Sequence, residues 1–180
     1  MNGREVVIGV TGGIAAYKTA ALVSRLVQAG AGVSVVMTKA ATQFVGPTTF
    51  AALTGRAVGT DLFVSAEYHL GQHIALADRA DLLCVAPATA NFLAKAAQGI
   101  ADDLLSTLYL AFRGPVLLAP AMNSAMWEKP AVQRNVQQLG ADGVYFVGPD
   151  AGWLSCRATG AGRMSEPEAI FAAIAERLRA

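Results

Sequence analysis

The segment "EVVIGVTGGIAAYKTAALVSRLVQAG", residues 5–30, largely decides the fold of this 180-residue chain. Its short β-branched run predicts a buried strand over residues 5–10, and the turn "TGG" follows directly. A helix is expected next, ending at Gly30. Helical spacing places a set of apolar side chains on one face of this helix: Ile14, Tyr17, Leu22, Val23, Leu26 and Val27. The order is therefore strand, tight turn, helix.

Four later apolar runs repeat the type of the first strand. They are "GVSVVMT" at 32–38, "DLLCVAP" at 81–87, "GPVLLAP" at 114–120 and "GVYFVGP" at 143–149, with helix-length segments between them. Continuous apolar strands indicate a sheet that is covered on both faces. The sequence therefore predicts an α/β protein with a doubly wound, mostly parallel sheet, a Rossmann-like or flavodoxin-like three-layer sandwich. We expect one domain over residues 1–180.

The end of the chain is expected to differ from this alternation. After Gly148 the sequence predicts an irregular segment, and "EPEAIFAAIAERLRA" at 166–180 then predicts an amphipathic helix with proline in its first turn. Proline follows three of the predicted strands. It either simply ends the strand or helps to shape the rim of a pocket.

Composition narrows the class of protein and its partners. A net charge of +1 without a basic run argues against nucleic acid as a partner. The hydrophobic fraction of 54% without a long apolar run favours buried subunit interfaces over a membrane span, so we expect a cytoplasmic homo-oligomer. The two cysteines are far apart and form no cluster with histidine, so we expect neither a metal site nor a disulfide.

The glycine turn at 12–13 stands where a strand gives way to a helix. Backbone N–H groups at such a helix start can hold an anion, although a tight turn alone also explains the glycines. The turn matches neither the dinucleotide fingerprint nor a Walker loop, and no acidic residue ends the second strand. A mononucleotide phosphate fits better than NAD or ATP.

Polar side chains beyond the third and fourth strands are candidate ligand contacts. Thr89 and Asn91 could bond a planar heterocycle or its phosphate chain, and Asn123 lies beside Met122, Met126 and Trp127 at the expected ligand edge. Asp102 and Asp103 are expected to cap the next helix.

The two cysteines and the two histidines differ in their expected roles. Cys84, inside "LLCVA", is expected to be a buried small hydrophobic residue. Cys156, between Ser155 and Arg157 in a glycine-rich stretch, is expected to be reachable and to have a lowered pKa. The chemistry alone does not make either His69 or His73 a catalytic residue.

Five segments in this order give a specific resemblance: "GGIAAYK", "HIALADRADLLCVAPATAN", "GIADDLL", "PAMNSAMW" and "GWLSCRATGAGRM". Together they resemble the flavin-dependent cysteine decarboxylase family over essentially the whole chain. The resemblance implies FMN as cofactor. Carried over by position, it assigns nine residues to the flavin cleft: Gly13, Thr38, Phe44, Pro87, Ala88, Thr89, Ala90, Asn91 and Ala121.

The same resemblance assigns the catalytic and substrate-binding residues. His73 corresponds to the base, whereas His69 does not match, and Asn123 corresponds to the residue that holds the substrate carboxylate. The segment "LSCRATGAGRM" corresponds to a flexible clamp over the substrate, with Cys156 as proton donor. Contacts from the clamp are expected from Ser155, Cys156, Arg157 and Met164. The family clamp commonly has glycine where this chain has Arg157.

The implied reaction is the FMN-dependent decarboxylation of 4′-phosphopantothenoyl-L-cysteine to 4′-phosphopantetheine in coenzyme A biosynthesis. In it the cysteinyl thiol is oxidised to a thioaldehyde, CO₂ leaves, and the remaining enethiolate is reduced. Two alternatives stay open, a peptidyl-cysteine decarboxylase of a lantibiotic-type pathway and a non-catalytic flavin-binding interaction protein. The expected partners are a small cysteinyl substrate, further copies of the chain as a trimer or a dodecamer of trimers, and a separate phosphopantothenate–cysteine ligase.

Overall fold

A computed structural model describes residues 1–63, 71–155 and 157–179. Its strands are β1 (Glu5–Val10), β2 (Gly32–Met37), β3 (Leu82–Ala88), β4 (Val116–Pro120), β5 (Tyr145–Phe146), β6 (Asp150–Trp153) and β7 (Thr159–Arg163). Its helices are α1 (Ala16–Gln28), α2 (Pro47–Thr54), α3 (Gln72–Arg79), α4 (Ala90–Gln98), α5 (Leu104–Ala111), α6 (Ser124–Trp127), α7 (Pro130–Ala141) and α8 (Pro167–Arg177), with a short 3₁₀ turn η1 (Ala41–Gln43).

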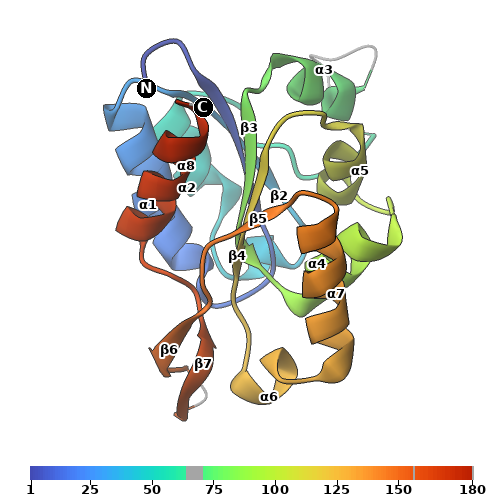
Figure 1. The fold of residues 1–180 in the computed structure, drawn as a ribbon. Helices are drawn as coiled ribbons and strands as arrows, with labels where there is room; N and C mark the ends of the chain where they lie inside the picture. The colour runs from blue at the N-terminus through green and yellow to red at the C-terminus, as the bar shows by residue number, and fades with distance from the viewer. Residues whose placement is uncertain (64–70, 156, 180) are drawn as a thin grey trace.

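The central sheet is parallel throughout, with strand order β2-β1-β3-β4-β5. This is the flavodoxin-like order, so the predicted doubly wound α/β sandwich is confirmed. Helices α1, α2 and α8 cover one face, and α3, α4, α5 and α7 cover the other (Figure 1). The chain direction across the sheet reverses between β1 and β3, which is where ligands bind in open α/β sheets.

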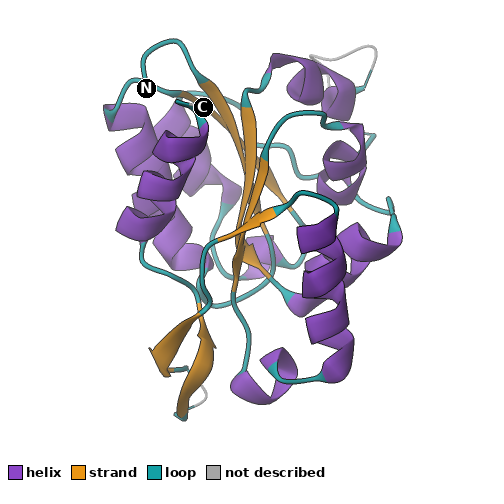
Figure 2. Cartoon of the chain, in the orientation of Figure 1, coloured by secondary structure: helices purple, strands orange, loops and turns teal. Residues whose placement is uncertain are grey.

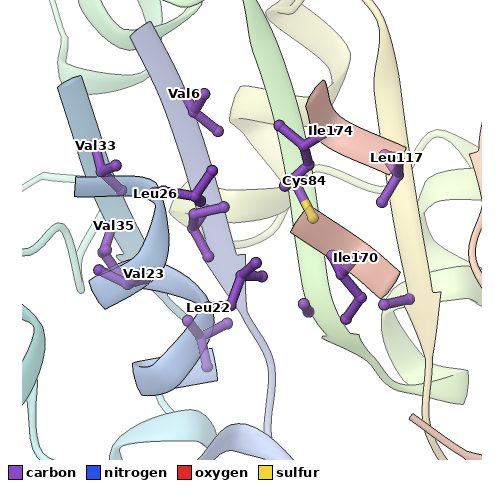
Figure 3. Close-up of a cluster of buried hydrophobic side chains, with 14 of the residues drawn as sticks. Val6, Leu22, Val23, Leu26, Val33, Val35, Cys84, Leu117, Ile170 and Ile174 are labelled. Atoms are coloured by element: carbon purple, nitrogen blue, oxygen red, sulfur yellow. The ribbon is translucent and has the colours of Figure 1, made fainter. Parts of the chain in front are cut away.

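The two faces of the sheet bury separate cores. On one face, side chains of β1, β3 and β4 meet α1 and α8, as Val6, Cys84 and Leu117 do with Ile170 and Ile174 (Figure 3). All seven residues of β3 are buried, as expected for a strand that is covered on both sides. Cys84 is fully buried, which confirms its expected role as a small core residue.

Three expectations need correction in the described chain. The run at 143–149 forms only the two-residue edge strand β5, because half-buried edge positions give it little packing. The segment after Gly148 is not irregular, because β6 and β7 pair as an antiparallel hairpin below the sheet (Figure 2). Ile14 and Tyr17 are 55% and 61% exposed, because Ile14 precedes α1 and Tyr17 does not lie on the buried face of this helix.

Other details of the helices agree with the sequence. Pro167 opens α8 as predicted, and Asp103 caps α5 through a complete capping box with Ser106. None of the helices in the described ranges is long and apolar enough to cross a membrane.

Burial determines the reactivity of Cys84. Removal of the thiol from water raises its pKa far above the ordinary value, so the nucleophilic thiolate is scarcely populated. In a Cys156→Ala variant, Cys84 is the only thiol, and we expect no reaction with Ellman's reagent until the protein is unfolded in guanidinium. The same assay on the unfolded wild type, which has two cysteines, is the control. A fast reaction of the native variant would contradict the burial of Cys84.

Candidate functional site

The hydroxyl of Thr11 joins the two loops that flank the reversal point of the sheet. Thr11 follows β1 and is 2% exposed. Its Oγ1 donates to the carbonyl oxygen of Pro87 at 2.7 Å and accepts from the backbone N–H of Thr89 at 3.1 Å. One turn into α1, the buried Thr19 hydroxyl donates to the carbonyl oxygen of Ala86 at 2.7 Å. The end of β3 is therefore held against the start of α1.

The turn between β1 and α1 presents unpaired backbone amides. Among the described residues, the N–H groups of Gly12, Ile14 and Ala15 have no hydrogen-bond acceptor, and α1 has no side-chain cap. A Cβ at Gly12 would lie 2.4 Å from that of Ala40, so only glycine allows this close approach. At Gly13 a Cβ would extend to within 3.6 Å of the Thr89 side chain and narrow the space between the two loops. The turn therefore forms an anion-binding cradle.

The loop between β3 and α4 forms the opposite wall. Thr89 caps α4 by accepting from the N–H of Phe92 at 3.4 Å. Further along α4, the ammonium of Lys95 lies 2.6 Å from Asp102 and 2.9 Å from Asp103. Burial alone would lower the pKa of Lys95, but the hydrogen bonds with these two carboxylates raise it above its ordinary value. Lys95 is therefore a charged, paired group.

The loop after β4 carries Asn123 at the start of the short helix α6. Its Oδ1 accepts from the N–H of Ala125 at 2.8 Å, which fixes the side chain as a helix cap. The preceding residue, Met122, donates its N–H to the carbonyl oxygen of Gly162 in β7 at 2.9 Å. Asn123 is thus tied to both α6 and the hairpin.

Two glycines let the hairpin lie against this loop. A Cβ at Gly162 would be 2.3 Å from the carbonyl oxygen of Met122, and one at Gly160 would be 2.4 Å from Oγ of Ser124. Gly162 also has φ of 128°, which side-chain-bearing residues rarely adopt. Gly162 is therefore required by a close backbone approach, whereas Gly160 makes room for the side chain of Ser124.

These loops enclose a cavity of about 1100 Å³ at the carboxyl edge of the sheet. Nine of the predicted site residues line it: Gly13, Thr38, Thr89, Ala90, Asn91, Ala121, Asn123, Ser155 and Met164. The structure thus brings together residues from five separate parts of the sequence.

The remaining predicted residues lie elsewhere. Phe44 is 48% exposed and outside the lining, Ala88 is fully buried, and Pro87 contributes its carbonyl group to Thr11. His73 lies in the first turn of α3 and does not line the cavity. Arg157 also lies outside the lining, and Cys156 and His69 lie outside the described residues.

Several cavity residues were not predicted as ligand contacts from the sequence. They are Thr11, Lys18, Lys95, Asp103, Trp153 and Arg163. Lys18 follows the glycine turn by one helical turn, a spacing that points its side chain to the same edge as Ile14. That spacing could have identified Lys18. Arg163 belongs to the segment that the family resemblance assigns to the clamp, but neither it nor Trp153 was named as a contact, because the paired strands of the hairpin were not predicted.

Arg157 has an unusual backbone conformation. Among the described residues it is the one non-glycine with positive φ, at 63°. Its N–H donates to the carbonyl oxygen of Leu154 at 2.9 Å, and the N–H of Leu154 donates to that of Ala158 at 2.8 Å, so the turn is closed on both sides. The left-handed conformation favours glycine, which gives a physical reason for glycine at this position in the family.

A flavodoxin-like sheet with an anion cradle and a large cavity at its reversal point defines a nucleotide-binding α/β protein. The family model described as Flavoprotein matches residues 1–179, so the chain belongs to the flavoprotein family.

Known relatives agree with this assignment. The chain is 52% identical over 170 residues to the coenzyme A biosynthesis bifunctional protein CoaBC of Bacillus subtilis, covering 94% of this chain and 42% of the relative. The corresponding protein of Haemophilus influenzae is 47% identical over 177 residues, with 98% of this chain and 44% of the relative covered. The chain therefore spans less than half the length of these curated relatives.

Solved structures extend the comparison. The FMN-dependent cysteine decarboxylase SpaF is 37% identical with a TM-score of 0.85, covering 98% of this chain and 96% of SpaF. A mutant PPC decarboxylase complexed with pantothenoylaminoethenethiol is 28% identical with a TM-score of 0.87, covering 98% and 99% of the two chains.

Removal of the Thr11 hydroxyl tests its bridging role. Thr11→Val keeps the shape of the side chain but leaves the carbonyl group of Pro87 and the N–H of Thr89 without their partner. We expect a loss of about 2–6 kcal/mol in unfolding free energy, since each of the two buried unpaired groups costs about 1–3 kcal/mol. Urea denaturation measures the loss. Thr48→Val, at an exposed position, is the control, and an equal effect in both would refute the bridge.

A glycine at Arg157 should relieve backbone strain. We expect Arg157→Gly to raise the unfolding free energy by about 0.5–1 kcal/mol, the left-handed cost of about 1–2 kcal/mol less the entropy that glycine adds to the unfolded chain. Arg157→Ala removes the same guanidinium but keeps the Cβ, and it should give no gain. Equal stability of the two variants in thermal unfolding would show that the backbone at Arg157 is unstrained.

Proposed function

We propose that the chain is an FMN-dependent decarboxylase that converts 4′-phosphopantothenoyl-L-cysteine to 4′-phosphopantetheine in coenzyme A biosynthesis. The observation that carries the proposal is the pairing of 47–52% identity to CoaBC proteins with the fold of PPC decarboxylase. The cavity adds support, since nine of the residues that the family resemblance assigns to cofactor and substrate line it.

The cavity suits FMN in both size and chemistry. Its volume of about 1100 Å³ lies at the top of the ~300–1,000 Å³ range of ligand sites, which leaves room for a substrate beside a cofactor. The unpaired amides of Gly12, Ile14 and Ala15 suit a phosphate at the positive end of α1, and the absent side chain at Gly13 keeps that space open. Ala121 and Met122 offer an apolar surface to a flavin ring, and Asn91 a polar group to its edge.

The residues of this chain would bind and orient the substrate. Bound FMN supplies the capacity to accept the electrons of thiol oxidation and to return them later. Asn123, fixed by its cap to α6, is placed to hold the substrate carboxylate at the cavity wall. Ser155 and Met164 line the hairpin side of the same space, where the hairpin would exclude water from the reacting carboxylate.

His73 requires a second copy of the chain in this proposal. It is assigned as the base, yet it lies on α3 and not at the cavity of its own chain. Its Nδ1 is buried without a partner among the described residues. Exposed apolar side chains on α1, α3 and α5, among them Tyr17, Ile74 and Leu110, offer surfaces for self-association. We therefore propose a homo-oligomer, a trimer or a dodecamer of trimers, in which α3 of one copy faces the cavity of another.

A second candidate is a cysteine decarboxylase that acts on a peptide. It is favoured by the identity of 37% to SpaF and of 34% to TvaF from thioviridamide biosynthesis, with 96% and 91% of those chains covered. A non-catalytic flavin-binding protein is the third candidate. Cytoplasmic location and a separate phosphopantothenate–cysteine ligase as partner remain predictions of the sequence.

Separate activity assays with two substrates distinguish the three candidate functions. FMN-loaded protein is incubated with 4′-phosphopantothenoyl-L-cysteine and, separately, with a peptide that ends in cysteine, and CO₂ release is measured. We expect turnover of the small substrate. Turnover of the peptide alone would establish the second candidate, and full FMN loading without turnover of either would establish the third.

Two variants separate the steps of the proposed reaction. Cys156→Ser should still release CO₂ but accumulate the unsaturated enethiol, because only the last protonation needs the thiol. His73→Asn should block the reaction before CO₂ release and leave the flavin absorbance near 450 nm unbleached, where ~450 nm is the usual oxidised-flavin band. Mass spectrometry of single-turnover products distinguishes them. Saturated product at the wild-type rate from Cys156→Ser would show that another group donates the proton.

A further inference from the structure

A second cavity lies apart from the site described above. Its volume is about 310 Å³, and it shares no lining residue with the large cavity. In the described chain it is lined by Ser34 and Val35 of β2, by Gly55–Ala57 after α2, and by Gln72, Leu76 and Arg79 of α3. The three α3 residues have the spacing of one helix face, so this helix directs two polar side chains at the edge strand of the sheet.

Gln72 is the first unusual feature of this cavity. It is only 9% exposed, and its side-chain amide makes no hydrogen bond with any described residue. The amide packs against Gly59, because a Cβ there would lie 2.9 Å from Nε2 of Gln72. The N–H of Gly59 donates to the carbonyl oxygen of Val35, and its carbonyl oxygen accepts from the N–H of Met37, so both backbone groups of Gly59 bond to β2. Because Gln72 lines the cavity, its amide can hydrogen-bond a ligand there.

The charges around the cavity are the second feature. Arg56 makes a two-point contact with Glu5, at 2.6 and 2.9 Å. Hydrogen bonding from Arg56 lowers the pKa of Glu5, so the carboxylate is ionised at neutral pH. Arg79 approaches the same carboxylate only to 3.7 Å, beyond hydrogen-bond distance. Glu5 therefore holds Arg56 more closely than it holds Arg79.

Ser34 completes the set of donors. The residue is 5% exposed, and its Oγ accepts from Nη2 of Arg79 at 2.7 Å and from Nη1 of Arg56 at 3.1 Å. A hydroxyl that accepts two charged hydrogen bonds still has its own proton to donate. A serine hydroxyl, a guanidinium and an amide thus converge on one small polar space.

We propose that this second cavity is a binding site for a phosphate group, held by Arg79, Gln72 and Ser34. A phosphate offers several acceptor oxygens and negative charge, which suit the guanidinium fork, the unpaired amide and the hydroxyl proton. The cavity is larger than one phosphate needs, so it can admit either free phosphate or a small phosphomonoester. The site stands independently of the proposed decarboxylase function, because it uses none of that cavity's residues.

Calorimetric titration of the FMN-loaded protein with inorganic phosphate tests the site at constant ionic strength. We expect saturable binding that weakens about tenfold or more in Arg79→Gln and in Gln72→Leu, because each removes a hydrogen-bond donor to the anion. Arg134→Gln, which removes the same charge from exposed α7, is the matched control and should bind as the wild type does. Far-UV circular dichroism and FMN content verify that each variant is folded.

The results decide the proposal in either direction. No phosphate binding by the wild type would overturn it, as would unchanged affinity in both cavity variants or an equal loss in Arg134→Gln. A parallel titration with glycerol 1-phosphate identifies the source of the phosphate group: tighter binding than inorganic phosphate assigns the site to a phosphomonoester, and weaker binding assigns it to the free ion.

Discussion

The bridge from Thr11 to the end of β3 is the constraint on which the site depends. Parallel strands β1 and β3 diverge toward helices on opposite faces of the sheet, so their following loops separate at the reversal point. A cavity forms there by topology alone, but its shape requires the loops to keep a fixed distance. The Thr11 hydroxyl sets this distance by bonding the carbonyl group of Pro87 and the N–H of Thr89 together. Because the bridge is buried, water does not compete for it.

The hairpin of β6 and β7 is positioned by backbone contacts with the loop after β4 and not by a buried side-chain bridge. It contributes no strand to the central sheet, and its attachment to the loop after β4 is the backbone bond between Met122 and Gly162. Only glycine allows the close approach of Gly162 to the backbone of Met122, and Gly160 lies against the side chain of Ser124. The side of the cavity formed by Asn123 and the side formed by the hairpin are therefore one connected unit. A displacement of the hairpin would therefore also displace Asn123.

The sequence predicted the sheet well because its strands are buried on both faces. Continuous apolar runs predicted the boundaries of β1, β2, β3 and β4 to within about two residues, because strands that are buried on both faces are apolar at every position. The hairpin strands escaped prediction because "DAGW" and "TGAGR" are rich in glycine and show neither continuous apolar character nor alternation. Their pairing is decided by contacts with Met122 and Ser124, which are distant in the sequence.

The site was predictable to a similar degree and for a similar reason. Residues at strand ends, such as Thr89 and Asn123, meet at one edge because the strands are parallel. The bridging role of Thr11 was not predictable, since a buried hydroxyl next to a glycine turn resembles any other turn residue. The position of His73 was not predictable from resemblance either. A matched motif assigns a role to a residue, but only the fold shows that α3 lies away from the cavity of its own chain.

Most of the cations that line the large cavity are paired with nearby carboxylates, which affects how the cavity can recognise an anion. Lys18 pairs with Glu166 at 2.9 Å, Lys95 pairs with Asp102 and Asp103, and Arg163 also contacts Glu166. Hydrogen bonding from Lys18 lowers the pKa of Glu166, so these pairs remain ionised at neutral pH. The attraction for an anionic group then falls mainly to the unpaired amides at the start of α1 and to Lys39, which lines the cavity without an ion pair among the described residues. Amides with fixed directions select for the shape of an anion as well as its charge, and their directions are fixed because the Thr11 bridge holds the turn.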